Sequence, residues 1–89
     1  MELGEGVKHI LNGLHRKRRI GGKHTEERNV LRFLNTYPPE LQKKVLSDWD
    51  YCIKEGFVLR VKKTGEWHVS LNPRKLKELK ALVEGECYA

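Results

Sequence analysis

The spacing of apolar residues changes between residues 38 and 71, and this change constrains the fold more than any other feature. Over 38–56 apolar residues recur every three to four positions, which is the spacing of one helix face. From Phe57 onwards they recur at every second position, which is the spacing of a strand. The pattern therefore predicts an amphipathic helix followed directly by a hairpin. The apolar face of that helix is predicted to contain Leu41, Val45, Leu46, Trp49, Cys52 and Ile53.

The residues at the borders of these elements fit a helix and a hairpin. Pro38 and Pro39 suit a first helical turn, where a backbone N–H has no partner within the helix. Gly56 follows the last periodic residue and suits a left-handed C-terminal cap. Residues 63–66, Lys-Thr-Gly-Glu, predict the turn between two strands. The first strand contains the alternating Phe57, Leu59 and Val61, and the second contains Trp67, Val69 and Leu71.

Three more helices are predicted, two before this stretch and one after it. Thr25 is a favourable N-cap for the second helix, with two glutamates following it in the first turn. Asn72 as N-cap and Pro73 as first residue predict a C-terminal helix over 73–84, which Gly85 ends. The apolar stripes of the three helices are Val7, Ile10, Leu11 and Leu14; Val30, Leu31 and Leu34; and Leu76, Leu79, Leu82 and Val83.

The length and charge of the chain favour a single basic domain, 1–89. Eighteen Lys and Arg against 12 Asp and Glu give a net charge of +6. A basic surface attracts polyanions, above all nucleic acid, although mixed charge can also serve solubility alone. There is no apolar run of membrane-spanning length and no signal peptide after Met1. We therefore expect no membrane partner and a cytoplasmic protein, nucleoid-associated if it is prokaryotic.

The sequence gives no indication of a cofactor or of catalysis. The two cysteines and four histidines have none of the spacings of a metal site. Cys52 falls on the apolar helix face and is expected in the core, and we expect no disulfide to Cys87. Glycine-rich nucleotide loops, GxSxG and HExxH are all absent from the sequence. We expect a protein that is not an enzyme.

The predicted order of helix, helix, helix, strand, strand and helix resembles the winged helix-turn-helix superfamily. The resemblance covers residues 7–71 and is carried by TEERNVLRFL, PPELQKKVLSDWDYCIKEG and FVLRVKKTGEWHVSL. The runs KHTEERNVLRFL, IKEGFVLRV and VSLNPRKLKEL are similar to small archaeal winged-helix proteins of unassigned function. The resemblance implies a mainly helical α+β fold: a three-helix core, a β-hairpin wing and an additional C-terminal helix. It also implies a short strand near residues 22–24.

The resemblance further implies that the third helix enters the major groove of DNA and that the hairpin tip touches the backbone. Lysines there would contact phosphates, and a serine could contact base edges. The alternation of Trp67 favours a core position over stacking on a nucleotide. The predicted nucleic-acid-binding residues are Lys43, Lys44 and Ser47 on the third helix; Arg60, Lys62, Lys63 and His68 on the hairpin; and Arg16, Lys17, Arg18, Arg19, Lys23 and Arg28 elsewhere.

Two acidic residues in the third helix, Asp48 and Asp50, weaken direct base reading because they repel phosphates. We therefore expect double-stranded DNA to be bound mainly through its backbone, as by a transcription regulator or a chromatin-associated factor. The alternatives are a protein-interaction module of a larger assembly and an RNA-binding domain. The apolar stripe of the C-terminal helix could form a homodimer or cover the chain's own core. That stripe is Leu76, Leu79, Leu82 and Val83.

Overall fold

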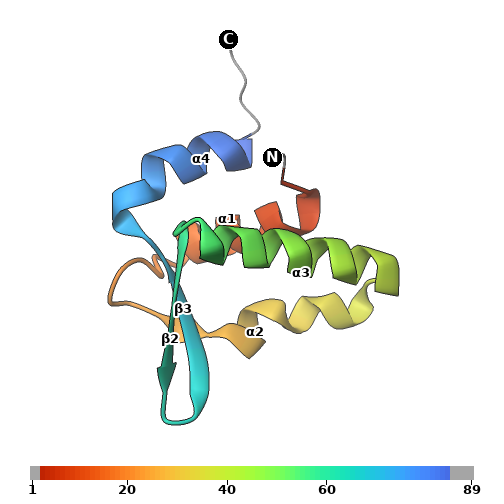
Figure 1. Cartoon of the computed structure of the whole chain (residues 1–89), viewed down its shortest axis with the longest axis horizontal. Coiled ribbons are helices and arrows are strands. Elements are labelled where there is room, and N and C mark those ends of the chain that lie inside the picture. Colours follow the sequence, from red (N-terminus) through yellow and green to blue (C-terminus); the bar gives the residue numbers. More distant parts are fainter. Residues whose placement is uncertain (1–2, 85–89) are drawn as a thin grey trace.

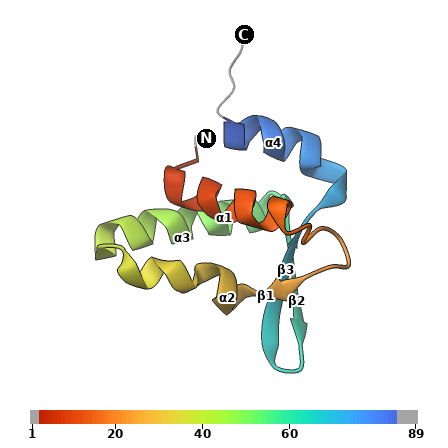
Figure 2. The same cartoon turned by 180° about the vertical axis from the view of Figure 1, so that it is seen from behind.

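The computed structural model describes residues 3–84 as a mainly helical α+β fold (Figures 1 and 2), compatible with a winged-helix layout. Gly85 and Cys87 lie outside the described residues. Within residues 3–84 there are four α-helices and one antiparallel sheet with strand order β1-β3-β2. The elements are α1 (Glu5–Arg16), β1 (Thr25–Glu26), α2 (Glu27–Leu31), α3 (Pro39–Lys54), β2 (Val58–Lys63), β3 (Glu66–Leu71) and α4 (Leu76–Glu84), with 3₁₀ segments at Arg32–Thr36 and Pro73–Lys75.

The helices surround one apolar core at the upper end of the hairpin. In Figure 1, α3 lies in front of α1, α4 lies above both, and the β2–β3 hairpin projects downwards. Figure 2 shows the reverse side, where α1 is in front. Helices α1 and α3 bury one stripe each against one another, as amphipathic helices do; α1 also packs on β3, and α3 also packs on β2. The fully buried apolar side chains include Val7, Leu11, Cys52, Val58, Val69 and Leu71.

The amphipathic helix predicted over 38–56 is confirmed as α3, but two of its predicted core leucines are exposed. Gly56 has the expected left-handed conformation, φ +81°, after the last turn. Leu41 is 51% exposed because α1 begins opposite Asp48, so nothing from α1 covers the first turn of α3. Leu46 is 44% exposed because it lies about 100° around the helix from Val45, at the margin of the buried stripe.

The hairpin forms where the period of two predicted it, with Thr64 and Gly65 at its tip. Both residues have positive φ, 49° and 84°, and Gly65 takes this conformation without strain. The upper part of one sheet face is buried, with Val58 on β2 opposite Leu71 on β3. The same face of β3 carries Trp67 further down, beyond the helices.

The sequence placed the short first strand and the second helix imprecisely. The strand is Thr25–Glu26, paired with β3, rather than residues 22–24. Thr25 therefore does not cap a helix; Glu26 is the N-cap of α2, and its side chain makes no capping hydrogen bond. Competition from β3 explains the difference, because a β-branched threonine pairs well with Val69 across the sheet.

The acidic residue expected to repel phosphates, Asp48, is in fact a buried structural group. The backbone N–H of Gly4, the N-cap of α1, donates to its Oδ2 at 2.9 Å. The ammonium of Lys44 donates to Oδ1 at 3.0 Å. Its carboxylate therefore satisfies a free donor at the start of α1 and complements the positive end of that helix.

The stripe of the C-terminal helix covers the chain's own core. Asn72 is an N-cap as expected, because its Oδ1 accepts from the N–H of Arg74. It caps the 3₁₀ segment Pro73–Lys75, which leads directly into α4. Leu79 is buried, and Leu76, Leu82 and Val83 pack against the core while remaining partly exposed.

Replacing Asp48 by alanine should lower the free energy of unfolding by about 2 kcal/mol, since it leaves the partly buried Gly4 N–H without an acceptor. The matched control is Asp50→Ala, which removes only an exposed pair with Lys54 and should change the free energy by less than about 0.5 kcal/mol. Urea denaturation of both variants measures the difference. Equal losses for the two would show that the Asp48 contacts do not stabilise α1.

Candidate nucleic-acid interface

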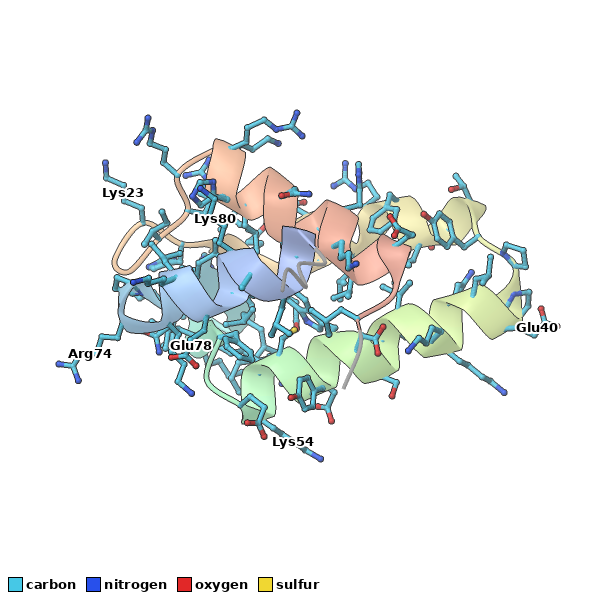
Figure 3. The ribbon with its side chains drawn as sticks, turned by 90° about the horizontal axis from the view of Figure 1, so that it is seen from above. Lys23, Glu40, Lys54, Arg74, Glu78 and Lys80 are labelled. Atoms are coloured by element: carbon cyan, nitrogen blue, oxygen red, sulfur yellow. The ribbon has the colours of Figure 1, made fainter. Side chains whose placement is uncertain are left out.

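The predicted binding residues are divided between two sides of the molecule. One group lies on the outer surface of α3, and the other lies on the segment after α1 and on the hairpin. In Figure 3, which views the molecule from above, Lys54 on α3 and Lys23 after α1 lie on opposite sides. The segment after α1 and the outer surface of α3 are therefore turned away from each other.

The outer surface of α3 is balanced in charge. Lys43 and Ser47 are exposed, as expected of groups that contact a ligand. Lys44, however, is held by the buried Asp48, and Lys54 pairs with Asp50 at 3.4 Å. The acidic Glu40 at the start of α3 is also exposed (Figure 3). Little net positive charge is left on this surface for a phosphate backbone.

Two arginines predicted to bind nucleic acid are engaged within the chain. The guanidinium of Arg28 lies 3.6 Å from a carboxylate oxygen of Glu26 and 3.9 Å from one of Glu66. The guanidinium of Arg60 donates to Oε1 of Glu27 at 3.0 Å. Pairing with carboxylates offsets the positive charge of both arginines, so they add little attraction for phosphate.

Trp67 is on the hairpin rather than in the core, and the prediction of a core position is wrong. Its indole is 41% exposed, because the helices cover only the upper part of this sheet face. Arg60 lies 4.3 Å from the centre of the indole ring, and Lys62 lies 5.4 Å from it. Cation–π contacts of this kind stabilise the hairpin surface. Lys62 lies on the same sheet face as Trp67. Because successive residues of a strand point to opposite faces, Lys63 lies on the other face.

A contact that the sequence did not predict joins the hairpin to the helices. Glu27, in the first turn of α2, accepts from the indole N–H of Trp49 through Oε2 at 2.7 Å. Its other oxygen, Oε1, accepts from Arg60. One carboxylate therefore connects α2, α3 and β2. The sequence does not indicate this contact, because a glutamate in the first turn of a helix is already accounted for by its interaction with the helix dipole.

The end of α1 and the segment that leads from it to β1 form the most basic part of the described chain. Residues 16–24, Arg-Lys-Arg-Arg-Ile-Gly-Gly-Lys-His, contain five cations and no carboxylate. Its backbone is anchored to the sheet: Leu71 N–H donates to Arg19 O at 2.8 Å, and Gly21 N–H donates to Leu71 O at 2.9 Å. Arg16, Lys17 and Arg18 are exposed. Positive side chains are therefore concentrated on a segment whose backbone is hydrogen-bonded to β3.

A hollow lies on the open face of the sheet, next to this segment. It has a volume of about 260 Å³. Its floor includes Leu59 and Val61, which are 38% and 44% exposed, so these members of the predicted apolar strand do not face the core. The covered face of a strand depends on where the helices pack, and the period of two cannot show which face that is. The hollow is lined by Gly21, Gly22, His24, Leu59, Val61, Lys63, His68 and Ser70.

Two histidines that are 44 residues apart in the sequence meet in this hollow. The Nδ1 atoms of His24 and His68 are 3.0 Å apart, so one ring nitrogen donates and the other accepts. The rings are nearly perpendicular, at 89°, with centroids 4.8 Å apart. Partial burial, and then the positive charges of Lys63 and His68, hold the pKa of His24 below 6.5. The neutral form of His24 is therefore favoured, and the charged group that lines the hollow is Lys63.

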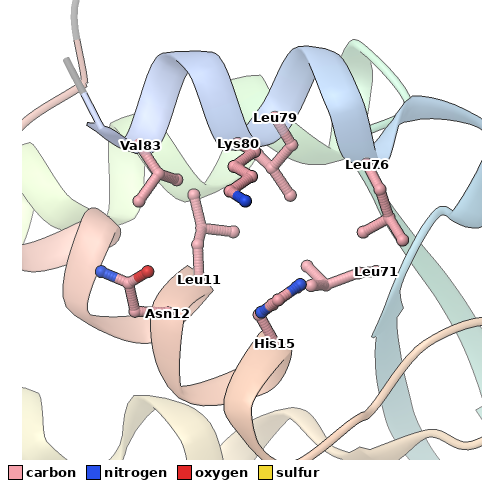
Figure 4. A pocket seen from close by; sticks show the side chains of 8 residues that line it. All are labelled: Leu11, Asn12, His15, Leu71, Leu76, Leu79, Lys80 and Val83. Carbon is pink, nitrogen blue, oxygen red and sulfur yellow. The ribbon is translucent and has the colours of Figure 1, made fainter. Parts of the chain in front are cut away.

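A second, smaller pocket lies between α1 and α4 (Figure 4). Its volume is about 90 Å³. It is mostly apolar, and polar side chains from both helices reach its mouth (Figure 4). This space is what remains where the partly exposed stripe of α4 rests on α1. Its lining residues are Leu11, Asn12, His15, Leu71, Leu76, Leu79, Lys80 and Val83.

Outside this interface, the described residues carry no sign of a metal site, a membrane span or a reactive thiol. No cluster of three or more metal-ligating side chains exists among residues 3–84. No helix in that range combines the length and apolar character needed to cross a membrane. Cys52 is buried, and burial, with the nearby Asp48, raises the pKa of its thiol to about 11, so it is poorly nucleophilic. Comparisons with protein-family models, curated proteins and solved structures found no match.

Replacing Lys63 by glutamine should raise the pKa of His24, because it removes one of the positive charges that lower it. The matched control is Lys62→Gln, which should leave His24 unchanged because Lys62 lies on the other sheet face, over Trp67. Titration of the imidazole protons by NMR measures both effects. Equal shifts in the two variants would contradict this geometry.

The lowered pKa of His24 also determines how the stability of the fold depends on pH. The folded state disfavours protonated His24 more than the unfolded chain does, so the stabilisation linked to this histidine is fully present above its ordinary pKa. It is lost as the pH falls through the folded-state pKa of His24.

Proposed function

We propose that this chain is a winged-helix DNA-binding protein that holds the phosphate backbone of double-stranded DNA through the segment after α1 and the neighbouring hairpin, rather than through α3. The observation that carries this proposal is the run of five cations over residues 16–24, uninterrupted by any carboxylate. The adjacent hollow adds Lys63 from the hairpin tip. Lysine and arginine contacts to phosphate position a protein on DNA without reading its sequence.

The anchoring of the basic segment supports this function over a role in solubility alone. Charges that serve solubility need no fixed path, whereas Arg19 and Gly21 are hydrogen-bonded to β3 through their backbone. Fixing the backbone lowers the entropy lost when the side chains bind. The opposing charges of α3 argue for the same orientation, because Asp50 and Glu40 would face the DNA if α3 did.

A protein partner is a second candidate function, and it is favoured by the outer surface of α3. Two large apolar residues, Leu41 and Leu46, are exposed on this helix beside charges that largely cancel. The two functions use opposite sides of the molecule and are compatible. A cytoplasmic or nucleoid location, and a role in transcription or chromatin, follow only from DNA binding. A homodimer through α4 is not part of this proposal, because Leu79 is buried in the chain's own core.

Replacing Lys17 and Lys23 together by glutamine should weaken binding to duplex DNA roughly tenfold at moderate salt. Each removed phosphate contact should also reduce the slope of log affinity against log salt by about one, hence about two for the pair. Fluorescence anisotropy with a mixed-sequence duplex, repeated over a range of salt concentrations, measures both quantities.

The matched control is Lys43→Gln with Lys77→Gln, which removes the same charge from exposed positions on α3 and α4. It should change affinity by no more than about twofold, the small effect left once salt screens distant charges. A larger loss in the control than in the Lys17 and Lys23 variant would contradict the proposed orientation. Salt-independent binding, or no binding by the unaltered chain, would contradict the function itself.

A further inference from the structure

The hollow beside the basic segment has features that phosphate contacts alone do not require. We propose that it holds one unpaired nucleotide of the bound strand, with the base on the apolar floor and its phosphate near Lys63. This inference rests on the proposed function and defines the form of nucleic acid that the site prefers. The chain should favour DNA that has a single-stranded end or an unpaired base over a perfect duplex.

The floor of the hollow suits a flat, uncharged ring. Leu59 and Val61 project from the open sheet face with more than a third of their surface exposed, although both are large apolar residues. Adjacent exposed apolar side chains of this kind typically mark a binding surface. The volume, about 260 Å³, is close to the lower limit of roughly 300 Å³ for small-ligand sites, and it suits one nucleotide rather than several.

The histidine pair supplies an aromatic surface for a base. His24 and His68 meet edge to face, at 89°. Because the two rings do not stack on each other, at least one keeps a ring face for a further partner. Unstacked bases are commonly held on aromatic side chains, including histidine. In a perfect duplex, both faces of each base are covered by the neighbouring base pairs. Only an unpaired nucleotide can therefore place a free base face on the histidines in the hollow.

The charges around the hollow favour a phosphate. Lys63 lines it, and its charge contributes to lowering the pKa of His24. Lys23 immediately precedes His24 in the chain. The nearby carboxylates are Glu26 on β1 and Glu66 on β3, and Arg28 lies within ion-pair distance of both. An acidic peptide could use the same cations, but a flat ring matches the floor and the histidines better than an extended chain does.

The test compares a blunt duplex with the same duplex carrying a short single-stranded overhang. The unaltered chain should bind the overhang duplex about tenfold more tightly, as expected from the stacking of one base. The double variant Leu59→Thr with Val61→Thr should lose most of this preference, because the base no longer has its apolar floor although His24 and His68 remain. Threonine keeps the strand propensity of these exposed positions, and circular dichroism verifies that the variant is folded.

The matched control is Leu41→Gln with Leu46→Gln, which removes two leucines of α3 that are at least as exposed as Leu59 and Val61. It should keep the preference for the overhang. Equal affinity of the unaltered chain for the two DNAs would overturn this inference while leaving the proposed function intact. Absence of binding to both DNAs would overturn both proposals.

A competing peptide extends the test. A short peptide of alternating glutamate and leucine should not displace the overhang duplex from the unaltered chain. If that peptide binds more tightly than either DNA, and loses its affinity in the Leu59 and Val61 variant, the hollow is a peptide site. That result would overturn the assignment to a nucleotide.

Discussion

The carboxylate of Glu27 joins the exposed half of the hairpin to the helices, below the part that the core holds in place. It accepts from Trp49 on α3 and from Arg60 on β2, while its backbone begins α2. A two-stranded hairpin is marginally stable alone, and the lower half of this one has no helix packed on it. The bonds of Glu27, extended by Arg60 over the ring of Trp67, hold one sheet face against α2. The other face consequently stays open, next to the basic segment.

This placement separates the two surfaces of the molecule. On one side α3 presents charges that largely cancel, together with Leu41 and Leu46. On the other side the carboxylate-free run 16–24 passes the open sheet face with its two histidines. The proposed site for a polyanion lies on the second side, and the second candidate, a protein-binding surface, lies on the first. The two proposed functions thus lie on different sides of the molecule, and the bonds of Glu27 contribute to the direction of the hairpin that separates them.

The sequence predicted what depends on neighbouring residues and missed what depends on distant ones. Helix α3, its cap at Gly56 and the turn at Gly65 follow from local periodicity and from backbone conformations that glycine adopts easily. The bond of Glu27 to Arg60 joins residues 33 positions apart, and the histidine pair joins residues 44 apart. No local pattern contains such pairs.

The candidate site was predicted in part for the same reason. The basic run 16–19 was evident from its composition, and the structure leaves most of it exposed. By contrast, the charges of Lys44 and Arg60 are engaged by Asp48 and Glu27, which the sequence could not show. A double-mutant cycle between Glu27→Gln and Arg60→Met, with the free energy of unfolding as readout, tests the role of this contact most directly. The pair is partly buried, so the cycle should give a coupling of about 1–2 kcal/mol; a coupling below about 0.3 kcal/mol, as for a solvent-exposed ion pair, would contradict it.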